Sequence, residues 1–144
     1  MLKVDIDVNS GFCGGVIRAI STAEKYLDSN DKLFSLGSIV HNEEELGRLG
    51  ALGLVPVKDV ADVPAGGTVL VRAHGVPPSV YDEAAGCGLK VIDCTCPVVL
   101  RLQKDIRECH ARLGGRGQVI LFGKIFRHEM NISRNYSWPF GSGR

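Results

Sequence analysis

Short apolar segments alternate with longer amphipathic segments along most of this chain. Turn-forming residues end the short segments, and the longer ones place apolar side chains three or four residues apart, as on one helix face. Such alternation favours an α/β fold, in which helices flank parallel sheets and the crossovers are right-handed. The predicted strands are 3–8, 32–36, 54–57, 68–72, 90–93 and 118–122, and the predicted helices are about 14–28, from 43 onward, 79–85 and 97–113.

Two details refine this plan. Pro56 lacks a backbone N–H, so segment 54–57 can only be an edge strand or a bulge. In the last helix the apolar stripe includes Cys109, which we therefore expect in the core. From Ile125 onward no period is sustained, and this tail is predicted to be irregular.

Composition restricts the class of protein. The 144 residues are 44% hydrophobic, which is enough for a globular core. Basic and acidic side chains number 17 and 16 and are mixed along the chain, which argues against a nucleic-acid partner. We find no signal peptide and no apolar run near the ~20 residues of a membrane helix. Five cysteines, an odd number, suit a reducing compartment, so a cytoplasmic protein is expected.

The segment Asp93–Pro97 leads from a predicted strand directly into a helix. Proline is favoured at the first helical position, which leaves Cys96 at the N-cap. Free backbone N–H groups and the helix dipole there favour a thiolate, the form that binds metals. A small buried cysteine that only packs is the alternative for Cys96 taken alone.

Several polar residues follow the carboxyl ends of predicted strands. In parallel sheets this edge binds ligands, because loops and helix N-termini converge there. Thiols, imidazoles and glycine turns in one pocket suggest a thiolate-bound metal beside an anionic group. Taken singly, each histidine could be a helix cap or a surface residue, and the glycine turn 11–15 could be only architectural. The residues concerned are Cys13, His41, His74, Cys96 and Lys124.

Four motifs in series resemble the iron-sulfur enzyme family of 4-hydroxy-3-methylbut-2-enyl diphosphate reductase. The order and spacing agree from about Val4 to Gly123. Together they are specific, although each is weak alone. The motifs are Gly11-Phe12-Cys13-Gly14-Gly15-Val16, Val40-His41-Asn42, Arg72-Ala73-His74-Gly75-Val76 and Asp93-Cys94-Thr95-Cys96-Pro97.

The resemblance implies a trefoil of three α/β domains around a central 4Fe-4S cluster held by one cysteine from each domain. Residues 1–13 would be the N-terminal strand and first cluster cysteine, 14–96 the first domain, and 97–144 an incomplete second domain with an irregular tail. Cys13 and Cys96 would be metal ligands, and His41 and His74 would bind the substrate diphosphate. The implied reaction removes the allylic hydroxyl with two electrons and two protons, giving isopentenyl and dimethylallyl diphosphate, with ferredoxin or flavodoxin as electron donor.

The sequence departs from this family near its end. Where a His-Pro-Glu motif is expected, the chain has Arg127-His128-Glu129. In an ungapped register Glu129 matches the family's proton-relaying glutamate; the alternative is that Glu129 is a surface carboxylate with no such role. His128 becomes a diphosphate ligand only if the loop shifts by one residue. No cysteine follows Cys109, so the third cluster ligand is missing and a truncated or frame-shifted copy is expected.

Two other functions remain open at this point. An inactive α/β fragment or interaction module would bind no cluster. A small zinc site could instead use Cys94, Cys96 and His74, although Cys94 should point to the opposite sheet face from Asp93 and Thr95. An incomplete fold would also expose surfaces meant for burial, so self-association is expected.

Overall fold

A computed structural model of the chain describes residues 2–8 and 10–120. The helices are α1 (Gly14–Leu27), α2 (Glu43–Leu52), α3 (Pro78–Gly86) and α4 (Pro97–Leu113), with a short 3-10 helix η1 (Val60–Asp62). The strands are β1 (Leu33–Leu36), β2 (Leu54–Val57), β3 (Thr68–Val71) and β4 (Lys90–Asp93). These bounds confirm the predicted helices and four of the six predicted strands.

The four strands form one parallel sheet in the order β2-β1-β3-β4. In the register of the sheet Leu33 lies opposite Leu54, and Phe34 opposite Val69. Strand β2 lies at an edge of the sheet, with β1 as its only neighbour in this sheet. The missing N–H of Pro56 therefore deprives no second strand of a hydrogen bond. The edge position predicted from this proline is confirmed.

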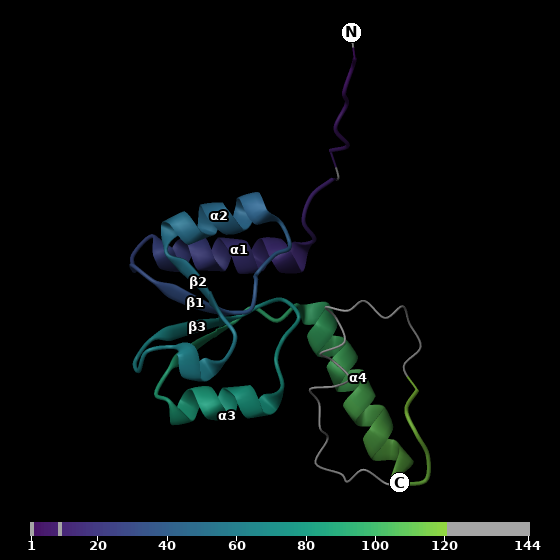
Figure 1. Cartoon of the computed structure of the whole chain (residues 1–144). Helices are drawn as coiled ribbons and strands as arrows, with labels where there is room; N and C mark the ends of the chain where they lie inside the picture. The colour runs from purple at the N-terminus through teal and green to yellow at the C-terminus, as the bar shows by residue number, and fades with distance from the viewer. Residues whose placement is uncertain (1, 9, 121–144) are drawn as a thin grey trace.

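Helices cover both faces of the sheet. Figure 1 shows α1 and α2 on one face and α3 on the other. Strand β3 is buried along its whole length and alternates between the two layers, with Leu70 in one core and Val69 and Val71 in the other. The first core joins α1 and α2 to the sheet, and the second joins η1 and α3 to it. The predicted α/β class is therefore confirmed.

The N-terminal segment differs from its prediction. Residues 2–8 form no strand, and Val4, Ile6 and Val8 are 73%, 81% and 95% exposed. Alternating side chains alone do not make a strand, because its backbone groups need a neighbour, and the described residues provide none beside this segment. Figure 1 shows it projecting away from the layers.

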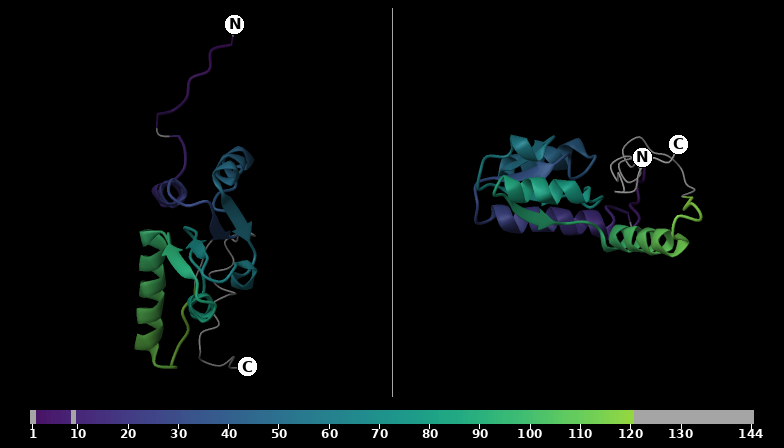
Figure 2. Two further views of the ribbon diagram at one scale, coloured as in Figure 1. Left: turned by 90° about the vertical axis from the view of Figure 1, so that its left-hand side faces the viewer. Right: turned by 90° about the horizontal axis from the view of Figure 1, so that it is seen from below.

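Helix α4 also leaves the layered unit. Figure 1 and the right-hand view of Figure 2 show it leading away from the sheet. None of its residues is buried, and Cys109 is only half-buried, so the prediction that Cys109 lies in the core is wrong for the described structure. The period of the helix is as predicted, but its apolar stripe is only partly covered, with Leu102 45% exposed and the other stripe residues half-buried.

Residues 118–120 carry no strand, and the rest of the predicted strand 118–122 lies outside the described residues. The irregular tail predicted from Ile125 onward lies outside them as well. Among the helices that the structure does describe, none is long and apolar enough to cross a membrane.

Candidate functional site

Two cysteines occupy the N-cap positions of two helices. Cys13 precedes α1 and Cys96 precedes α4, and both have extended backbone conformations with no capping hydrogen bond from the side chain. Pro97 stands at the start of α4, so the N-cap position predicted for Cys96 is confirmed. Each cysteine therefore stands at a helix N-terminus, where free backbone N–H groups and the helix dipole favour a bound anion.

The N-terminus of α1 packs against Cys96. A Cβ atom at Gly15 would lie 3.0 Å from Cys96 Sγ and 3.8 Å from the Cβ of Ala73. Glycine, without a Cβ, allows this approach without displacing Cys96. Cys96 N also donates to Ala73 O at 2.9 Å, which extends the pairing of β3 and β4 past the strand ends. Cys13, two residues before Gly15, thus belongs to the same corner of the molecule as Cys96.

Asp93 organises the segment that leads to Cys96. Its Oδ1 accepts hydrogen bonds from Thr95 N at 2.8 Å and from Thr95 Oγ1 at 2.5 Å. Its Oδ2 accepts from the hydroxyl of Tyr81 in α3 at 2.8 Å, and its main-chain oxygen accepts from Arg18 Nη2 in α1 at 3.2 Å. One residue thereby connects the Cys96 segment to helices on both faces of the sheet.

The carboxyl group of Asp93 is ionised in this arrangement. Burial raises its pKa, but the hydrogen bonds from Thr95 and Tyr81 and the charge of Arg18 lower it, and the net pKa lies below the ordinary value. The carboxylate therefore accepts these hydrogen bonds throughout the neutral range. Thr95, only 2% exposed, is held beside Cys96 by its two hydrogen bonds to Asp93.

The turn that carries His74 packs against the same segment. Gly75 N donates to Arg72 O at 2.9 Å and closes the turn. Gly75 has φ +74°, and a Cβ there would lie 3.1 Å from Thr95 Cγ2 and 3.6 Å from Gln103 Nε2 of α4. The half-buried His74 therefore adjoins the strand end that carries Cys96.

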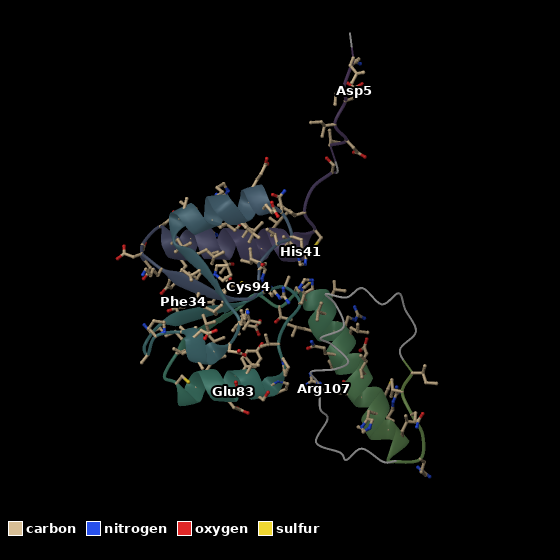
Figure 3. The ribbon with its side chains drawn as sticks, viewed as in Figure 1. Asp5, Phe34, His41, Glu83, Cys94 and Arg107 are labelled. Carbon is tan, nitrogen blue, oxygen red and sulfur yellow. The ribbon has the colours of Figure 1, made fainter. Side chains whose placement is uncertain are left out.

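His41 lies in the connection between β1 and α2. Ile39 and Val40 anchor this connection in the core, and Asn42 caps α2 by accepting from Glu45 N at 3.0 Å. His41 between them is exposed. Figure 3 shows it at the edge of the sheet where α1 and α4 begin. The structure thus brings Cys13, His41, His74 and Cys96 to one edge, and their roles as ligands stay predictions.

Cys94 lies apart from this edge. It is 1% exposed and packs in the first core with Ala19 and Leu70. Burial raises the pKa of its thiol, as does the charge of Asp93, while Thr22 and Arg18 oppose the shift only in part. A zinc site that joined Cys94 to Cys96 and His74 would have to pull Cys94 out of the core. Within residues 2–8 and 10–120, no three histidine, cysteine or acidic side chains are arranged to hold a metal ion.

Three sequence-predicted residues, Lys124, His128 and Glu129, lie outside the described residues. Sequence reasoning gave no role to Arg18, Arg72, Tyr81 or Thr95, although all four bind the segments that carry the site. Arg72 directly follows β3 and stands two residues before His74, a position that could have drawn attention to it.

The chain is similar to known proteins over most of its length. The family model described as LytB protein matches residues 4–134. A 4-hydroxy-3-methylbut-2-enyl diphosphate reductase of Porphyromonas gingivalis is 47% identical over 134 residues, or 91% of this chain. The protein of the same name from Chlorobium luteolum is 49% identical over 135 residues, or 90% of this chain. The solved structure of the E-1-hydroxy-2-methyl-but-2-enyl-4-diphosphate reductase from Plasmodium falciparum superposes with a TM-score of 0.67 at 32% identity, covering 73% of this chain.

These matches also limit what can be carried over. The chain spans 46% and 40% of the length of the two bacterial relatives and 33% of the Plasmodium chain. The family match continues to residue 134, so the expectation that the likeness ends near Gly123 is corrected. The matched range therefore includes the segment with His128 and Glu129.

Proposed function

Because this chain belongs to the LytB protein family, we propose that it forms the part of a 4-hydroxy-3-methylbut-2-enyl diphosphate reductase that carries two cluster cysteines and two diphosphate-binding histidines. In this proposal residues 14–96 are the first domain of a three-domain trefoil, and residues 97–144 begin the second. The contact between Gly15 and Cys96 carries the proposal, because it brings the helix that follows Cys13 against Cys96 at the edge where the histidines lie.

The described residues suit part of an iron-sulfur site. Cys13 and Cys96 would hold the cluster, since thiolates are the usual ligands of iron-sulfur clusters and a helix N-terminus stabilises thiolate charge. A bound 4Fe-4S cluster would relay electrons and offer a Lewis-acidic iron to the substrate hydroxyl. A third thiolate would come from the part of the relatives' length that this chain does not span.

The histidines suit a diphosphate. His41 and His74 stand on two loops at the edge where α1 and α4 present their N-termini, and imidazole N–H groups and helix N-termini both bind phosphate oxygens. An allylic diphosphate held there would have its hydroxyl oriented toward the cysteines. His128 would add a third diphosphate contact, and Glu129 would pass protons to the leaving hydroxyl.

The proposed reaction is the reductive removal of that hydroxyl as water. Two electrons from a reduced ferredoxin or flavodoxin and two protons break the carbon–oxygen bond and give isopentenyl and dimethylallyl diphosphate. The proposed setting is the cytoplasm. We expect slow turnover by this chain, because its 144 residues contain no cysteine after Cys109 to complete the ligand set.

A turnover assay tests the proposal. The chain, loaded anaerobically with iron and sulfide, would be mixed with dithionite-reduced methyl viologen and 4-hydroxy-3-methylbut-2-enyl diphosphate. Product formation above the level of His41→Ala and His74→Ala variants supports the reductase. Product formation that both variants retain in full contradicts the assigned roles of the histidines.

A second function is favoured by one observation. Val98, Leu100 and Leu102 of α4 are 75%, 46% and 45% exposed, as expected of an interaction module that has lost its chemistry. Such a module would bind neither cluster nor diphosphate. Absence of iron, sulfide and product, together with binding of a protein partner through α4, would favour it.

A further inference from the structure

Arg72 connects the two loops that carry the histidines. Its guanidinium Nη1 donates to Ser38 O at 3.2 Å, in the connection between β1 and His41. Its own main-chain oxygen accepts from Gly75 N at 2.9 Å and closes the turn that contains His74. Side chain and backbone of one residue thus hold the His41 connection and the His74 turn on neighbouring strands.

The guanidinium fits closely against Gly37. A Cβ atom at Gly37 would lie 3.3 Å from Nη1 and 3.4 Å from Cζ of Arg72, and Gly37 has φ +73°. Gly37 is itself held in place, because its N–H donates to Val57 O at 2.9 Å and its oxygen accepts from the buried Ser35 hydroxyl at 3.0 Å. The guanidinium therefore rests on a rigid support, and its position is not that of a loose surface side chain.

The charge of Arg72 lacks an internal counter-ion. The ion pairs among the described residues join other side chains, and no carboxylate in that part of the chain pairs with Arg72. Burial lowers the pKa of the guanidinium, although an arginine stays protonated. Half-buried charges are usually compensated, so an anion from outside the chain would satisfy this one.

We propose that Arg72 is a positioning residue for a diphosphate: it ties the His41 loop to the His74 turn and adds an uncompensated positive charge between them. The inference rests on the proposed function. It extends that function by a residue that acts both through the histidine loops and through its own charge. A planar guanidinium suits this task, since it can donate to Ser38 O while its other N–H groups stay available to a phosphate oxygen.

Binding of inorganic pyrophosphate tests the inference. Calorimetric titration would compare the full 144-residue chain with Arg72→Gln, Arg72→Lys and the control Arg107→Gln. Arg107 is exposed on α4, and Figure 3 shows it away from the edge that carries His41, so its replacement removes the same net charge elsewhere. We expect Arg72→Gln to weaken pyrophosphate binding about tenfold or more, which corresponds to the loss of one charge-assisted hydrogen bond. Arg107→Gln should change it less than about twofold, and Arg72→Lys, which keeps a charge and a donor, should recover most of the loss.

A double variant separates positioning from general stabilisation. If Arg72 acts through the His41 loop, the effects of Arg72→Gln and His41→Ala on pyrophosphate affinity should be less than additive. Hydrogen exchange should also become faster at the amides of residues 37–42 and 73–75 in Arg72→Gln, and stay unchanged in Arg107→Gln. Hydrogen exchange is measured without ligand and below the melting temperature of each variant. It therefore reports on the two histidine loops and not on global unfolding.

Each other outcome has a defined meaning. If Arg72→Gln lowers the melting temperature but leaves both affinity and loop exchange unchanged, Arg72 is only structural and the inference is overturned, while the proposed function stands. The inference also fails if the loops loosen without a change in affinity. If the parent chain and His41→Ala both fail to bind pyrophosphate, the proposed diphosphate site is wrong, and the inference fails with it.

Discussion

Gly15 and Cys96 lie in direct contact, with 3.0 Å between the Cys96 sulfur and the position that a Cβ at Gly15 would take. The contact joins the first turn of α1 to the N-cap of α4, across 81 residues of sequence, the difference between positions 96 and 15. It shows why a helix begins with two glycines, residues with poor helix propensity. At least one of them is needed for the close approach.

Gly14 and Gly15 provide a matched pair for a first prediction. A Cβ at Gly14 would meet no atom within 4 Å, whereas one at Gly15 would meet Cys96. Gly14→Ala should therefore stabilise the chain by about 0.5 kcal/mol through helix propensity. Gly15→Ala should destabilise it by about 1 kcal/mol or more through overpacking, and change the alkylation rate of Cys96. Urea unfolding measures both, and equal stabilisation by the two variants would contradict the contact.

A second prediction concerns acid. The pKa of Asp93 is lower in the folded chain than in the unfolded chain. Its contribution to the free energy of unfolding is therefore complete above the unfolded pKa of about 3.9, and it is lost as the pH falls through the folded pKa. At pH 7 Asp93→Asn should cost about 1 kcal/mol of unfolding free energy, the usual value for such hydrogen bonds. The cost should shrink below about pH 3.9. Asp82→Asn, a change at an exposed residue of α3, serves as control, and a cost for Asp93→Asn that does not vary with pH would refute the account.

Thiol labelling provides a third prediction. Cys94 is buried and its pKa is raised, so it should resist alkylation at neutral pH until the chain unfolds. Cys13 and Cys87 are exposed and should react first. Mass spectrometry of peptides after timed exposure to iodoacetamide would give the order. Early modification of Cys94 in folded protein would contradict its place in the core.

The surface of α4 gives a fourth prediction. Leu102 is 45% exposed and Leu70 is fully buried, so Leu102→Lys should leave the unfolding free energy nearly unchanged, while Leu70→Ala should lower it by about 3 kcal/mol. Leu102→Lys should also reduce self-association, measured by light scattering across a concentration series. Equal self-association by parent and variant would show that this face is not the cause.

Local chemistry predicted much of this fold. Pro56 indicated an edge strand and Pro97 indicated the N-cap at Cys96, because proline limits both the backbone and its hydrogen bonds. Residues 2–8 and the stripe of α4 show the limit of such reasoning. A periodic pattern reveals an apolar face, but it does not reveal which element covers that face.

The candidate site was predictable to a similar extent. The cysteines and histidines stand directly after strands or before helices, and parallel topology brings such positions to one edge. The residues that hold them were missed. Tyr81 reaches Asp93 across 12 residues of sequence and Arg72 reaches Ser38 across 34, and no local pattern specifies such contacts.

Cluster uptake tests the central claim, that Cys13 and Cys96 belong to one iron-sulfur site. The chain and its Cys13→Ser, Cys96→Ser and Cys87→Ser variants would be reconstituted anaerobically, and their iron, sulfide and visible absorbance measured. Cys87 is the matched control, because it is the C-cap of α3 just before β4. It therefore lies near the amino ends of the strands, whereas the proposed site lies at their carboxyl ends. We predict broad visible absorbance with bound iron and sulfide in the parent and in Cys87→Ser, and loss of all three in the other two variants. Equal iron and sulfide in all four proteins would contradict the claim.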